Sequence, residues 1–442
     1  MNAPADNFLS QLDARAAALE AKVIAWRRDF HAHPELGNEE VRTSAIVAEH
    51  LKKLGLDDVR TGVAKTGVVA TLKGGKPGPC IALRADMDGL PVTEQTDVPF
   101  KSHRRTQWDG AEVGAMHACG HDCHTAMLMG VAELFAGMRD DLCGTIKFIF
   151  QPAEEGLPNY ANGGAKMMIE EHALENPRPE AIFGIHVISH LNVGKVGYRP
   201  GAMMASTDNF FIKIKGRQTH GAMPWLGADP IVASAQVVLG MQTLVSRQLD
   251  IMENPAVVTF GAINGGNREN IIPDEVTLRG TFRTFDETQR EHIRTRIEET
   301  AVNIACACQT TAEVRTHKGY PVTVNDPKLA LWSLPTLAKV AGDNNVVHVP
   351  RTGGGEDFSY YQKEIPGVFY FIGITPEGQD PAKAPSNHSP HFYVDEKGRC
   401  SACAWSRIWW WITKRHTHKQ HTPPNRHRPQ SRSHQGPWAT DA

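Results

Sequence analysis

The sequence predicts an α/β protein built on a mixed, mostly parallel sheet, with a smaller α+β unit inserted into it. Residues 1 to about 195 alternate helical and strand patterns, which is typical of an α/β layer architecture. The stretch 206–318 follows a different order of elements, and α/β patterning resumes after it. These observations predict one larger domain in two parts, 1–205 and 319–396, interrupted by a second domain at 206–318.

The elements of the larger domain follow from hydrophobic periodicity. Apolar residues at helical spacing predict helices at 40–56 and 124–138. Short apolar runs predict strands, and near-continuous runs are expected in a parallel sheet that is covered on both faces. The predicted strands lie at 67–74, 80–92, 144–150, 181–187 and 367–374.

The elements of the second domain follow the order strand, helix, strand, strand, helix, strand. Their ranges are 208–216, 229–249, 256–265, 275–285, 287–307 and 311–320. This β-α-β-β-α-β order is that of the ferredoxin-like unit. We therefore expect a ferredoxin-like α+β domain between the two parts of the larger one.

Composition is that of an ordinary globular enzyme. The chain has 442 residues, enough for roughly two or three domains, with 41% hydrophobic and 22% charged residues. No apolar run approaches the ~18 residues of a membrane span, and the first residues lack a signal-peptide pattern. Both observations favour the cytoplasm. Eight cysteines in so long a chain argue against a disulfide scaffold.

Charge is distributed unevenly along the chain. The formal net charge is −2, but residues 397–442 hold nine Lys or Arg and one acid. Residues 1–396 therefore hold 38 basic and 48 acidic residues, a net charge of −10. Because phosphate contacts need clustered basic groups, this acidic body argues against nucleic-acid binding.

The tail at 397–442 is atypical, with five of the nine Trp and five of the 21 His. Its composition from Thr417 predicts disorder, and our hypothesis is that the end arose by a change of reading frame. Arg407 and Thr413 occupy positions where a zinc finger needs apolar residues, which argues against a finger here. The finger-like spacing is formed by Cys400, Cys403, His416 and His421.

Side chains of the kind that bind metals follow several predicted strands. They are Asp86 and Asp88, Cys119 and His121, Glu154 and Glu155, and His186. In open α/β sheets ligands bind outside the carboxyl ends of the strands, so we expect these residues to converge. Thiolate, imidazole and carboxylate together suit zinc or a similar divalent ion. Adjacent Glu154 and Glu155 point to different sides of an extended segment, so one can bind metal while the other acts as a base.

Eight motifs along the chain are informative together, namely "RRDFHAHPELGNEE", "RADMDGLPV", "GAMHACGHDCHTAMLMG", "FIFQPAEEG", "GIHV", "GAMPWLGADPI", "NIIPDEVTLRGTFR" and "GGGEDFSYY…NHSPHF". They resemble, in family order, the motifs of the amidohydrolase branch of the M20 metallopeptidase family. That branch includes hippurate hydrolases, aminoacylase-like enzymes and hydrolases of indoleacetyl–amino-acid conjugates, and the resemblance covers about residues 15–396. The resemblance implies a zinc-peptidase-like catalytic domain with a lid and dimerisation domain, and hydrolysis of N-acyl amino acids.

The resemblance also implies roles for individual residues. Glu154 matches the general base, and Asp88 an acid that orients a metal ligand. His220 matches a lid histidine that reaches the partner subunit's active site in related homodimers, and Asn270 and Arg283 match residues that bind the substrate carboxylate. Two divalent ions per subunit (Zn, Mn, Co or Ni) are implied, with the ligands Cys119, His121, Glu155, His186 and His388.

Some features leave alternatives open. Cys123 stands where the family usually has Gly, and we expect it to pack rather than react. His391 is an alternative to His388 as a ligand. Supporting rather than ligating roles are expected for His31, His33, His117, Asp122 and His124. The alternative functions are a dipeptidase or an N-acetyl-diaminopimelate-type deacetylase on the same scaffold, or a catalytically impaired metal-binding protein.

Overall fold

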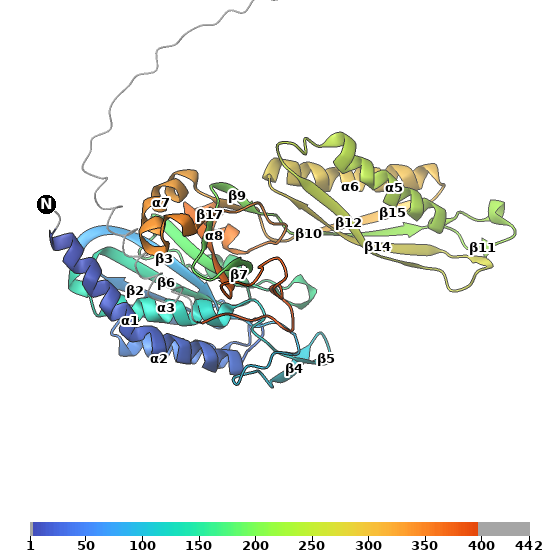
Figure 1. The fold of residues 1–442 in the computed structure, drawn as a ribbon. Coiled ribbons are helices and arrows are strands. Elements are labelled where there is room, and N and C mark those ends of the chain that lie inside the picture. The colour runs from blue at the N-terminus through green and yellow to red at the C-terminus, as the bar shows by residue number, and fades with distance from the viewer. Residues whose placement is uncertain (1–2, 397–442) are drawn as a thin grey trace, which may run out of the picture.

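The structure, a computed structural model, describes residues 3–396. Two predictions fall outside this range, namely the atypical tail at 397–442 and the finger-like spacing within it. In the range described, none of the helices combines the length and the apolar content that a membrane span requires. The chain forms a large sheet with helices around it and a smaller sheet beside it (Figure 1).

The large sheet has eight strands, and its centre is parallel. Across the sheet the order is β1 (Asp58–Val63), β2 (Gly67–Lys73), β6 (Cys143–Gln151), β3 (Lys76–Asp86), β7 (Ala181–Asn192), β18 (Gly367–Thr375), β8 (Val196–Tyr198) and β17 (Val346–His348). Strand β3 pairs in parallel with β6 and β7, and β7 pairs in parallel with β18. Antiparallel pairs join β1 to β2, β2 to β6 and β18 to β8.

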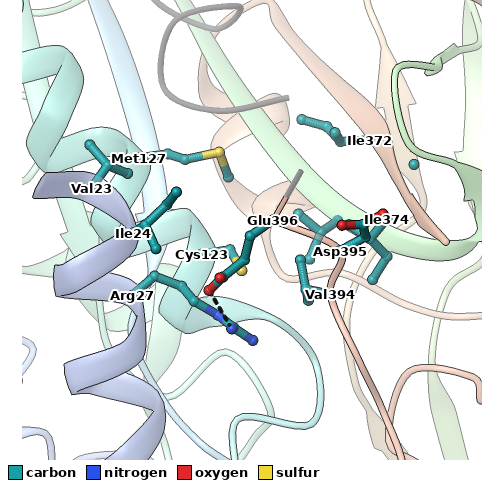
Figure 2. A pocket seen from close by; sticks show the side chains of 12 residues that line it. Val23, Ile24, Arg27, Cys123, Met127, Ile372, Ile374, Val394, Asp395 and Glu396 are labelled. Atoms are coloured by element: carbon teal, nitrogen blue, oxygen red, sulfur yellow. Dashed lines mark hydrogen bonds and ion pairs between the residues drawn. The ribbon is translucent and has the colours of Figure 1, made fainter. Parts of the chain in front are cut away.

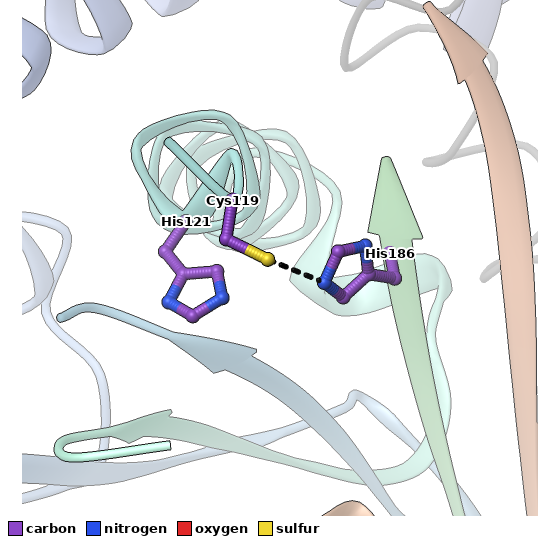
Figure 3. Close-up of side chains that lie close together, drawn as sticks. All are labelled: Cys119, His121 and His186. Atoms are coloured by element: carbon purple, nitrogen blue, oxygen red, sulfur yellow. Dashed lines mark hydrogen bonds between the residues drawn. The ribbon is translucent and has the colours of Figure 1, made fainter. Parts of the chain in front are cut away.

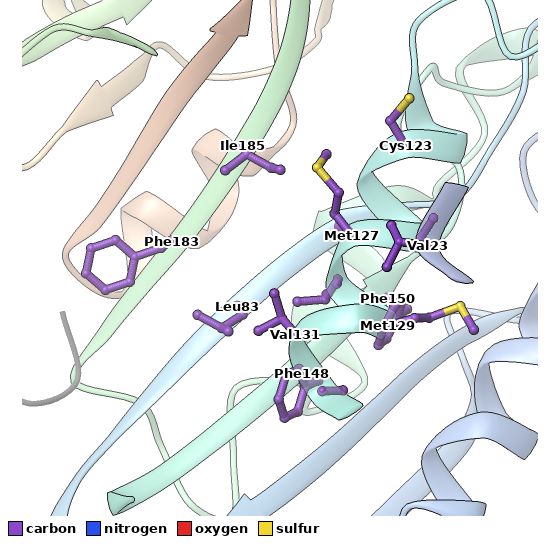
Figure 4. Packing of buried hydrophobic residues seen from close by; sticks show 14 of the residues in the cluster. Val23, Leu83, Cys123, Met127, Met129, Val131, Phe148, Phe150, Phe183 and Ile185 are labelled. Atoms are coloured by element: carbon purple, nitrogen blue, oxygen red, sulfur yellow. The ribbon is translucent and has the colours of Figure 1, made fainter. Parts of the chain in front are cut away.

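Helices bury both faces of the large sheet. Alternate side chains of a strand point to opposite faces, so Leu83 and Phe183 belong to one core (Figure 4), whereas Ala82 and Ile182 belong to the other. One core contains α1 (Ala3–Ala32), α2 (Val41–Lys53), α3 (His121–Ala136) and α7 (Pro327–Ala341). The other contains α4 (Gly164–Glu170) and α8 (Phe358–Glu364). These two cores explain why the central strands are mostly apolar on both faces.

A small apolar groove of about 70 Å³ lies between α1, α3, β18 and the last described residues (Figure 2). Val23, Met127 and Ile374 line it. Arg27 Nη1 lies 2.9 Å from Glu396 Oε1 beside the groove. This ion pair holds the end of the described chain against its first helix.

The second sheet has four antiparallel strands. Their order is β12 (Ala256–Gly265), β14 (Glu275–Thr284), β10 (Asp208–Lys215) and β15 (Thr311–Lys318). Apolar side chains of α5 (Pro230–Gln248) and α6 (Glu287–Ala307) form one core with this sheet. Along the chain the order is β-α-β-β-α-β, so the predicted fold class, a mixed α/β sheet with an inserted ferredoxin-like unit, is confirmed. The exact boundaries at 206 and 318 stay predictions.

Aspartate caps fix where the two helices of the second sheet begin. The Asp229 side chain accepts a hydrogen bond from the Ile231 N–H at 2.8 Å, and Pro230 is the first helical residue. The Asp286 side chain accepts one from the Gln289 N–H at 2.7 Å. Such caps satisfy backbone donors that the first helical turn leaves unpaired, and each stabilises a helix by about 1 kcal/mol.

Short elements that hydrophobic periodicity does not predict connect the larger ones. Strands β4 (Arg105–Trp108) and β5 (Ala111–Gly114) form a hairpin. Its turn residues Asp109 and Gly110 both have positive φ, and the Asp-Gly pair in the sequence is a recognised signal for such a turn. The remaining short strands are β9 (Gly201–Met204), which pairs with β16 (Thr323–Asn325), and β11 (Thr219–His220), which pairs with β13 (Ile271–Ile272).

Candidate metal centre

Polar side chains from several elements meet at one edge of the large sheet. Asp86 is the last residue of β3, Glu154 follows the end of β6, and His186 lies in β7. Helix α3 begins at His121, directly after Cys119 and Gly120. Because β3, β6 and β7 are parallel neighbours, their carboxyl ends bring these residues to the same place.

The structure brings the five predicted metal ligands together. Cys119 Sγ lies 3.2 Å from His186 Nε2 (Figure 3). His388 Nε2 lies 3.2 Å from Glu155 Oε1, and that oxygen lies 3.8 Å from His121 Nε2. Their ligand atoms form two overlapping groups of three, and within each group the atoms lie within 4.8 Å of one another.

Gly120 allows Cys119 and His121 to join the same ligand cluster. Its φ is +95°, a left-handed conformation that residues with a side chain rarely adopt. A Cβ at this position would lie 2.2 Å from Val187 Cγ2, which is too close for any side chain. The glycine therefore lets the chain turn into α3 directly against β7.

Hydrogen bonds orient the imidazoles of His121 and His186 in the ligand cluster. His121 Nδ1 lies 3.1 Å from Asp88 Oδ1, and His186 Nδ1 lies 2.7 Å from the Val187 carbonyl oxygen. Both rings consequently turn Nε2 toward the other predicted ligands. The Glu155 N–H donates to the other Asp88 oxygen at 2.9 Å. Asp88 thus positions two of the predicted ligands at once, as outer carboxylates do in metal sites.

Glu154 lies beside the cluster and is buried. Its Oε2 is 3.9 Å from His121 Nε2, and Ala153, with a φ of +52°, forms the turn that directs it there. The Tyr320 hydroxyl donates to the backbone carbonyl oxygen of Glu154 at 2.5 Å. Burial, together with the carboxyl groups of Glu356 and Glu155, raises the pKa of Glu154 well above its usual range.

The charges at this edge are unbalanced. Among the described residues, Arg84 is the one arginine or lysine that forms ion pairs with the carboxyl groups at this edge. It lies 2.6 Å from Asp86 and 2.8 Å from Asp357. Buried like charges repel strongly unless cations compensate them. The carboxyl groups in question are those of Asp86, Asp88, Glu154, Glu155, Glu356 and Asp357.

These residues fit a divalent metal. His121 Nε2 is buried without a hydrogen-bond partner. Burial and the nearby Glu155 and Glu154 raise the pKa of Cys119 well above its usual value. Burial would lower the pKa of His121, but Asp86 and Asp88 raise it to about 10. A divalent cation among these groups would lower the pKa values of Cys119 and His121, and it would therefore favour the thiolate and the neutral imidazole.

The histidines and acids that were expected to support the ligands have partners of their own. His124 Nδ1 lies 2.6 Å from Asp86 Oδ1, and its Nε2 accepts from the Val187 N–H. Asp122 accepts from Arg27 Nε at 2.8 Å and contacts His31 at 2.9 Å. His117 is different, because both of its ring nitrogens are buried without a partner, and burial lowers its pKa to about 4.

The remaining positions with open expectations lie apart from the cluster. Cys123 belongs to the apolar core that contains α3. His33 is on the surface and contacts the Asp29 carbonyl oxygen. His391 Nδ1 lies 3.2 Å from the Gln95 carbonyl oxygen, so His388 is the residue of this pair that faces the cluster.

Glu356 and Asp357 are members of the site that sequence analysis did not identify. Arg84 lies between them and Asp86, and the Gln151 side-chain amide donates to Asp357 at 2.8 Å. They follow the glycine run at 353–355, where no hydrophobic period marks an element. The acidic pair directly after the glycine run is the sequence feature that could have indicated these two site residues.

The second sheet places its predicted site residues differently. His220 and Asn270 are exposed, and β11 lies at the end of the second sheet that is away from the large sheet (Figure 1). Arg283 lies near the other end of β14, where the Ser206 N–H donates to the Thr284 carbonyl oxygen at 2.9 Å. Within one chain, His220 and Asn270 are therefore not brought to the cluster.

Comparison with known proteins agrees with the fold and the cluster. The family model for Peptidase family M20/M25/M40 matches residues 82–406. The chain is 39% identical to an N-acetyl-L-cysteine deacetylase from Bacillus subtilis over 380 residues, which are 86% of this chain and 85% of that protein. It is also 39% identical to an IAA-amino acid hydrolase from Arabidopsis thaliana over 401 residues, 88% of this chain and 87% of that protein.

A solved structure shows the same likeness. A dinuclear metal-binding peptidase of the M20 family from Bacillus subtilis aligns with a TM-score of 0.73 and 34% identity, covering 90% of this chain and 99% of that one. A cluster of thiol, imidazole and carboxyl groups at the edge of such a sheet is typical of metal-dependent hydrolases. The chain belongs to peptidase family M20/M25/M40, which confirms the predicted family, and it is an amidohydrolase.

Proposed function

We propose that this enzyme hydrolyses the amide bond of N-acyl amino acids of the hippurate type and releases a carboxylic acid and an amino acid. The observation that carries the proposal is the buried Glu154 carboxylate beside the ligand cluster, 3.9 Å from His121 Nε2. The names of the relatives support it, since N-acetyl-L-cysteine and IAA–amino acids are both N-acyl amino acids.

The proposed cofactor is a pair of divalent ions per subunit, of Zn, Mn, Co or Ni. When bound, such ions polarise a carbonyl and lower the pKa of a water molecule. The thiol, imidazole and carboxyl donors of the cluster support this proposal, because together they suit borderline divalent ions. The proposed ligands are Cys119, His121, Glu155, His186 and His388.

The chain's own groups then have defined tasks. Glu154 takes a proton from the attacking water and gives it to the leaving nitrogen as the C–N bond breaks. The Tyr320 hydroxyl holds the Glu154 backbone, and Asp88 keeps His121 and the Glu155 backbone in place. Burial of these groups limits the reorganisation that the reaction needs.

The second sheet has a proposed role in assembly and substrate binding. We propose a homodimer formed through this domain, in which His220 of one subunit reaches the centre of the other. Asn270 and Arg283 bind the substrate carboxylate, and the buried, unpartnered Nη1 of Arg283 supports this assignment. We also propose that the enzyme acts on a small-molecule substrate in the cytoplasm and that it binds neither nucleic acid nor a membrane.

A panel of substrates tests the proposed function. Release of free amino acid is measured from N-benzoyl, N-acetyl and N-indoleacetyl amino acids, with and without Zn, Mn, Co or Ni. We expect metal-dependent release, and a loss of about 10²- to 10⁴-fold in the Glu154→Ala variant. Equal activity of the wild type and this variant would contradict the proposal.

A deacetylase or dipeptidase on the same scaffold is the second candidate. The similarity to an N-acetyl-L-cysteine deacetylase favours it. Unblocked dipeptides and N-acetyl-diaminopimelate are therefore added to the panel. A kcat/KM highest for one of these compounds supports the second candidate over the first.

A further inference from the structure

A cleft of about 380 Å³ opens beside the metal centre. Several parts of the chain line it. They are the loop after β6, which includes Glu155 and Tyr160, the junction with the second sheet, Lys166 of α4, Tyr360 of α8 and Trp108 of the β4–β5 hairpin. Glu155 both lines the cleft and belongs to the ligand cluster, so the cleft adjoins the cluster at this residue. The volume lies within the roughly 300–1,000 Å³ that small-molecule pockets occupy.

Aromatic rings form much of the wall of this cleft. The Tyr160 ring is stacked on the His317 ring, with 4.1 Å between centroids and 31° between planes. Tyr320 and Tyr360 line the cleft with rings 6.2 Å apart. Tyr160 remains 49% exposed, so its ring is available to a ligand. Planar apolar groups pack well on such rings.

The backbone fixes the Tyr160 ring in an unusual position. Asn159 and Tyr160 have φ values of +57° and +55°, a region that side-chain-bearing residues seldom occupy. Successive residues in this conformation persist when surrounding structure holds them, and such strain is common next to ligand sites. Here it directs Tyr160 toward His317 at the junction with the second sheet.

The charges of the cleft indicate which end of a substrate it receives. Lys318 Nζ lies 2.5 Å from Glu291 Oε1, and Lys166 Nζ lies 3.9 Å from Glu170 Oε1, so both lysines of the cleft already have acidic partners. Arg283 Nη1, by contrast, is buried without a partner. The carboxylate end of the substrate therefore suits Arg283, and the acyl end suits the aromatic cleft.

We infer that the cleft is the acyl subsite and that Tyr160 and Trp108 select planar aromatic acyl groups, of benzoyl size or larger, over acetyl. This inference rests on the proposed hydrolysis of N-acyl amino acids. An acetyl group would leave most of the cleft filled with water, whereas an aromatic ring can displace that water and stack on Tyr160.

The test compares two substrates that differ in the acyl group alone. The ratio of kcat/KM for N-benzoylglycine to that for N-acetylglycine is measured in wild type, Tyr160→Ala, Tyr160→Phe and Trp108→Ala. We expect a ratio above one in wild type, a fall of about 10-fold in each Ala variant and little change in Tyr160→Phe. Tyr393→Ala is the matched control, because Tyr393 is 44% exposed and does not line the cleft.

A binding measurement separates failure of this inference from failure of the proposed function. Calorimetric titration of N-benzoylglycine and N-acetylglycine into Glu154→Gln protein, with and without Tyr160→Ala, requires no turnover. Tighter binding of the benzoyl compound than of the acetyl compound, lost in Tyr160→Ala, supports the subsite. This result would stand even if the wild type released no glycine and the proposed function failed. A benzoyl-to-acetyl ratio that neither Ala variant changes, in an enzyme that hydrolyses both compounds, overturns the subsite alone.

Discussion

The edge of the large sheet and the second sheet supply site residues in different ways. At the edge, separate elements of one chain bring Cys119, His121 and His186 together, because parallel strands end there. On the second sheet, His220 and Asn270 are exposed at the end away from that edge. The fold of a single chain thus assembles the first set, whereas the second set depends on how the inserted domain meets a substrate or another subunit.

The two regions also differ in what stabilises them. The edge buries several carboxyl groups with Arg84 as their basic partner, which is unfavourable without further cations. The core of the second sheet is apolar, with residues such as Phe210 and Ile297 fully buried. We therefore expect changes at the edge to affect metal content and chemistry, and changes on the second sheet to affect binding and assembly.

Replacing a cysteine in each region gives the largest expected contrast. Cys119→Ala removes a proposed ligand, so we expect kcat/KM to fall by about 100-fold or more and bound metal to decrease. Cys306→Ala, on the exposed side of α6, should change neither. Elemental analysis of the purified proteins and steady-state kinetics provide the measurements. Full metal content and activity in Cys119→Ala would contradict the proposed role of Cys119 as a metal ligand.

Mixing two inactive variants tests whether the second sheet acts on a partner subunit. We propose that His220 donates a hydrogen bond to the oxyanion at the partner's centre, so we expect His220→Ala to lose about 10²- to 10³-fold in kcat. Refolding an equal mixture with Glu154→Gln should restore about one quarter of wild-type activity, because half of the dimers are hybrids with one complete site.

The same mixture distinguishes the alternatives. If His220 serves its own chain, no hybrid contains a complete site, and the mixture stays inactive. His220→Ala and Glu154→Gln, each refolded alone by the same procedure, are the controls. Activity that appears in the mixture and in neither variant refolded alone requires that His220 of one subunit serves the site of the other.

Arg283 is the second-sheet residue nearest to the large sheet among those predicted, and its replacement should have a smaller effect. Arg283→Lys keeps the charge but loses the planar pair of donors that matches a carboxylate. We expect kcat/KM for N-benzoylglycine to fall by about 10-fold in Arg283→Lys and 100-fold in Arg283→Ala. The carboxamide of the same substrate, which lacks the negative charge, should be hydrolysed equally by all three proteins. An equal loss on both substrates would mean that Arg283 supports the fold rather than the carboxylate.

Sequence could predict the large-sheet edge because a local rule determines it. Side chains that follow parallel strands must meet, so Asp86, His121, Glu154 and His186 could be placed without knowing other contacts. His388 came from the family resemblance, since it lies in a loop with a φ of +72° and no periodic pattern.

Other residues of the site are placed by long-range contacts that no local rule determines. Arg84 Nη2 bonds Asp357 across 273 positions of the sequence, and neither residue's neighbours indicate that pairing. The order of elements in the second sheet was predictable from periodicity, but its position relative to the edge was not. Trp108 likewise reaches the cleft through a hairpin that only its Asp-Gly turn indicates.

A pH experiment tests the smallest expected difference between the two regions. His31 is buried behind the metal centre, and its ring nitrogens contact Asp122 at 2.9 Å and Glu94 at 3.1 Å. Burial alone would lower the pKa of His31, but the hydrogen bonds to Asp122 and Glu94 outweigh it and raise the pKa above 6.5. Protonation therefore favours the folded state. This contribution is fully present below the unfolded value of about 6.5 and is lost as pH rises through the folded pKa.

The His31→Gln variant removes this contribution. We expect it to lower the free energy of unfolding by about 2 kcal/mol at pH 6, the range for hydrogen bonds to charged groups, and by less at pH 9. Urea unfolding at both pH values, at one fixed metal concentration, measures the difference. His292→Gln, on the exposed side of α6, should give the same small difference at both pH values. A His31→Gln effect that grows toward pH 9 would show that His31 stabilises the fold as a neutral ring, and the charged network would then end at Arg27 and Asp122.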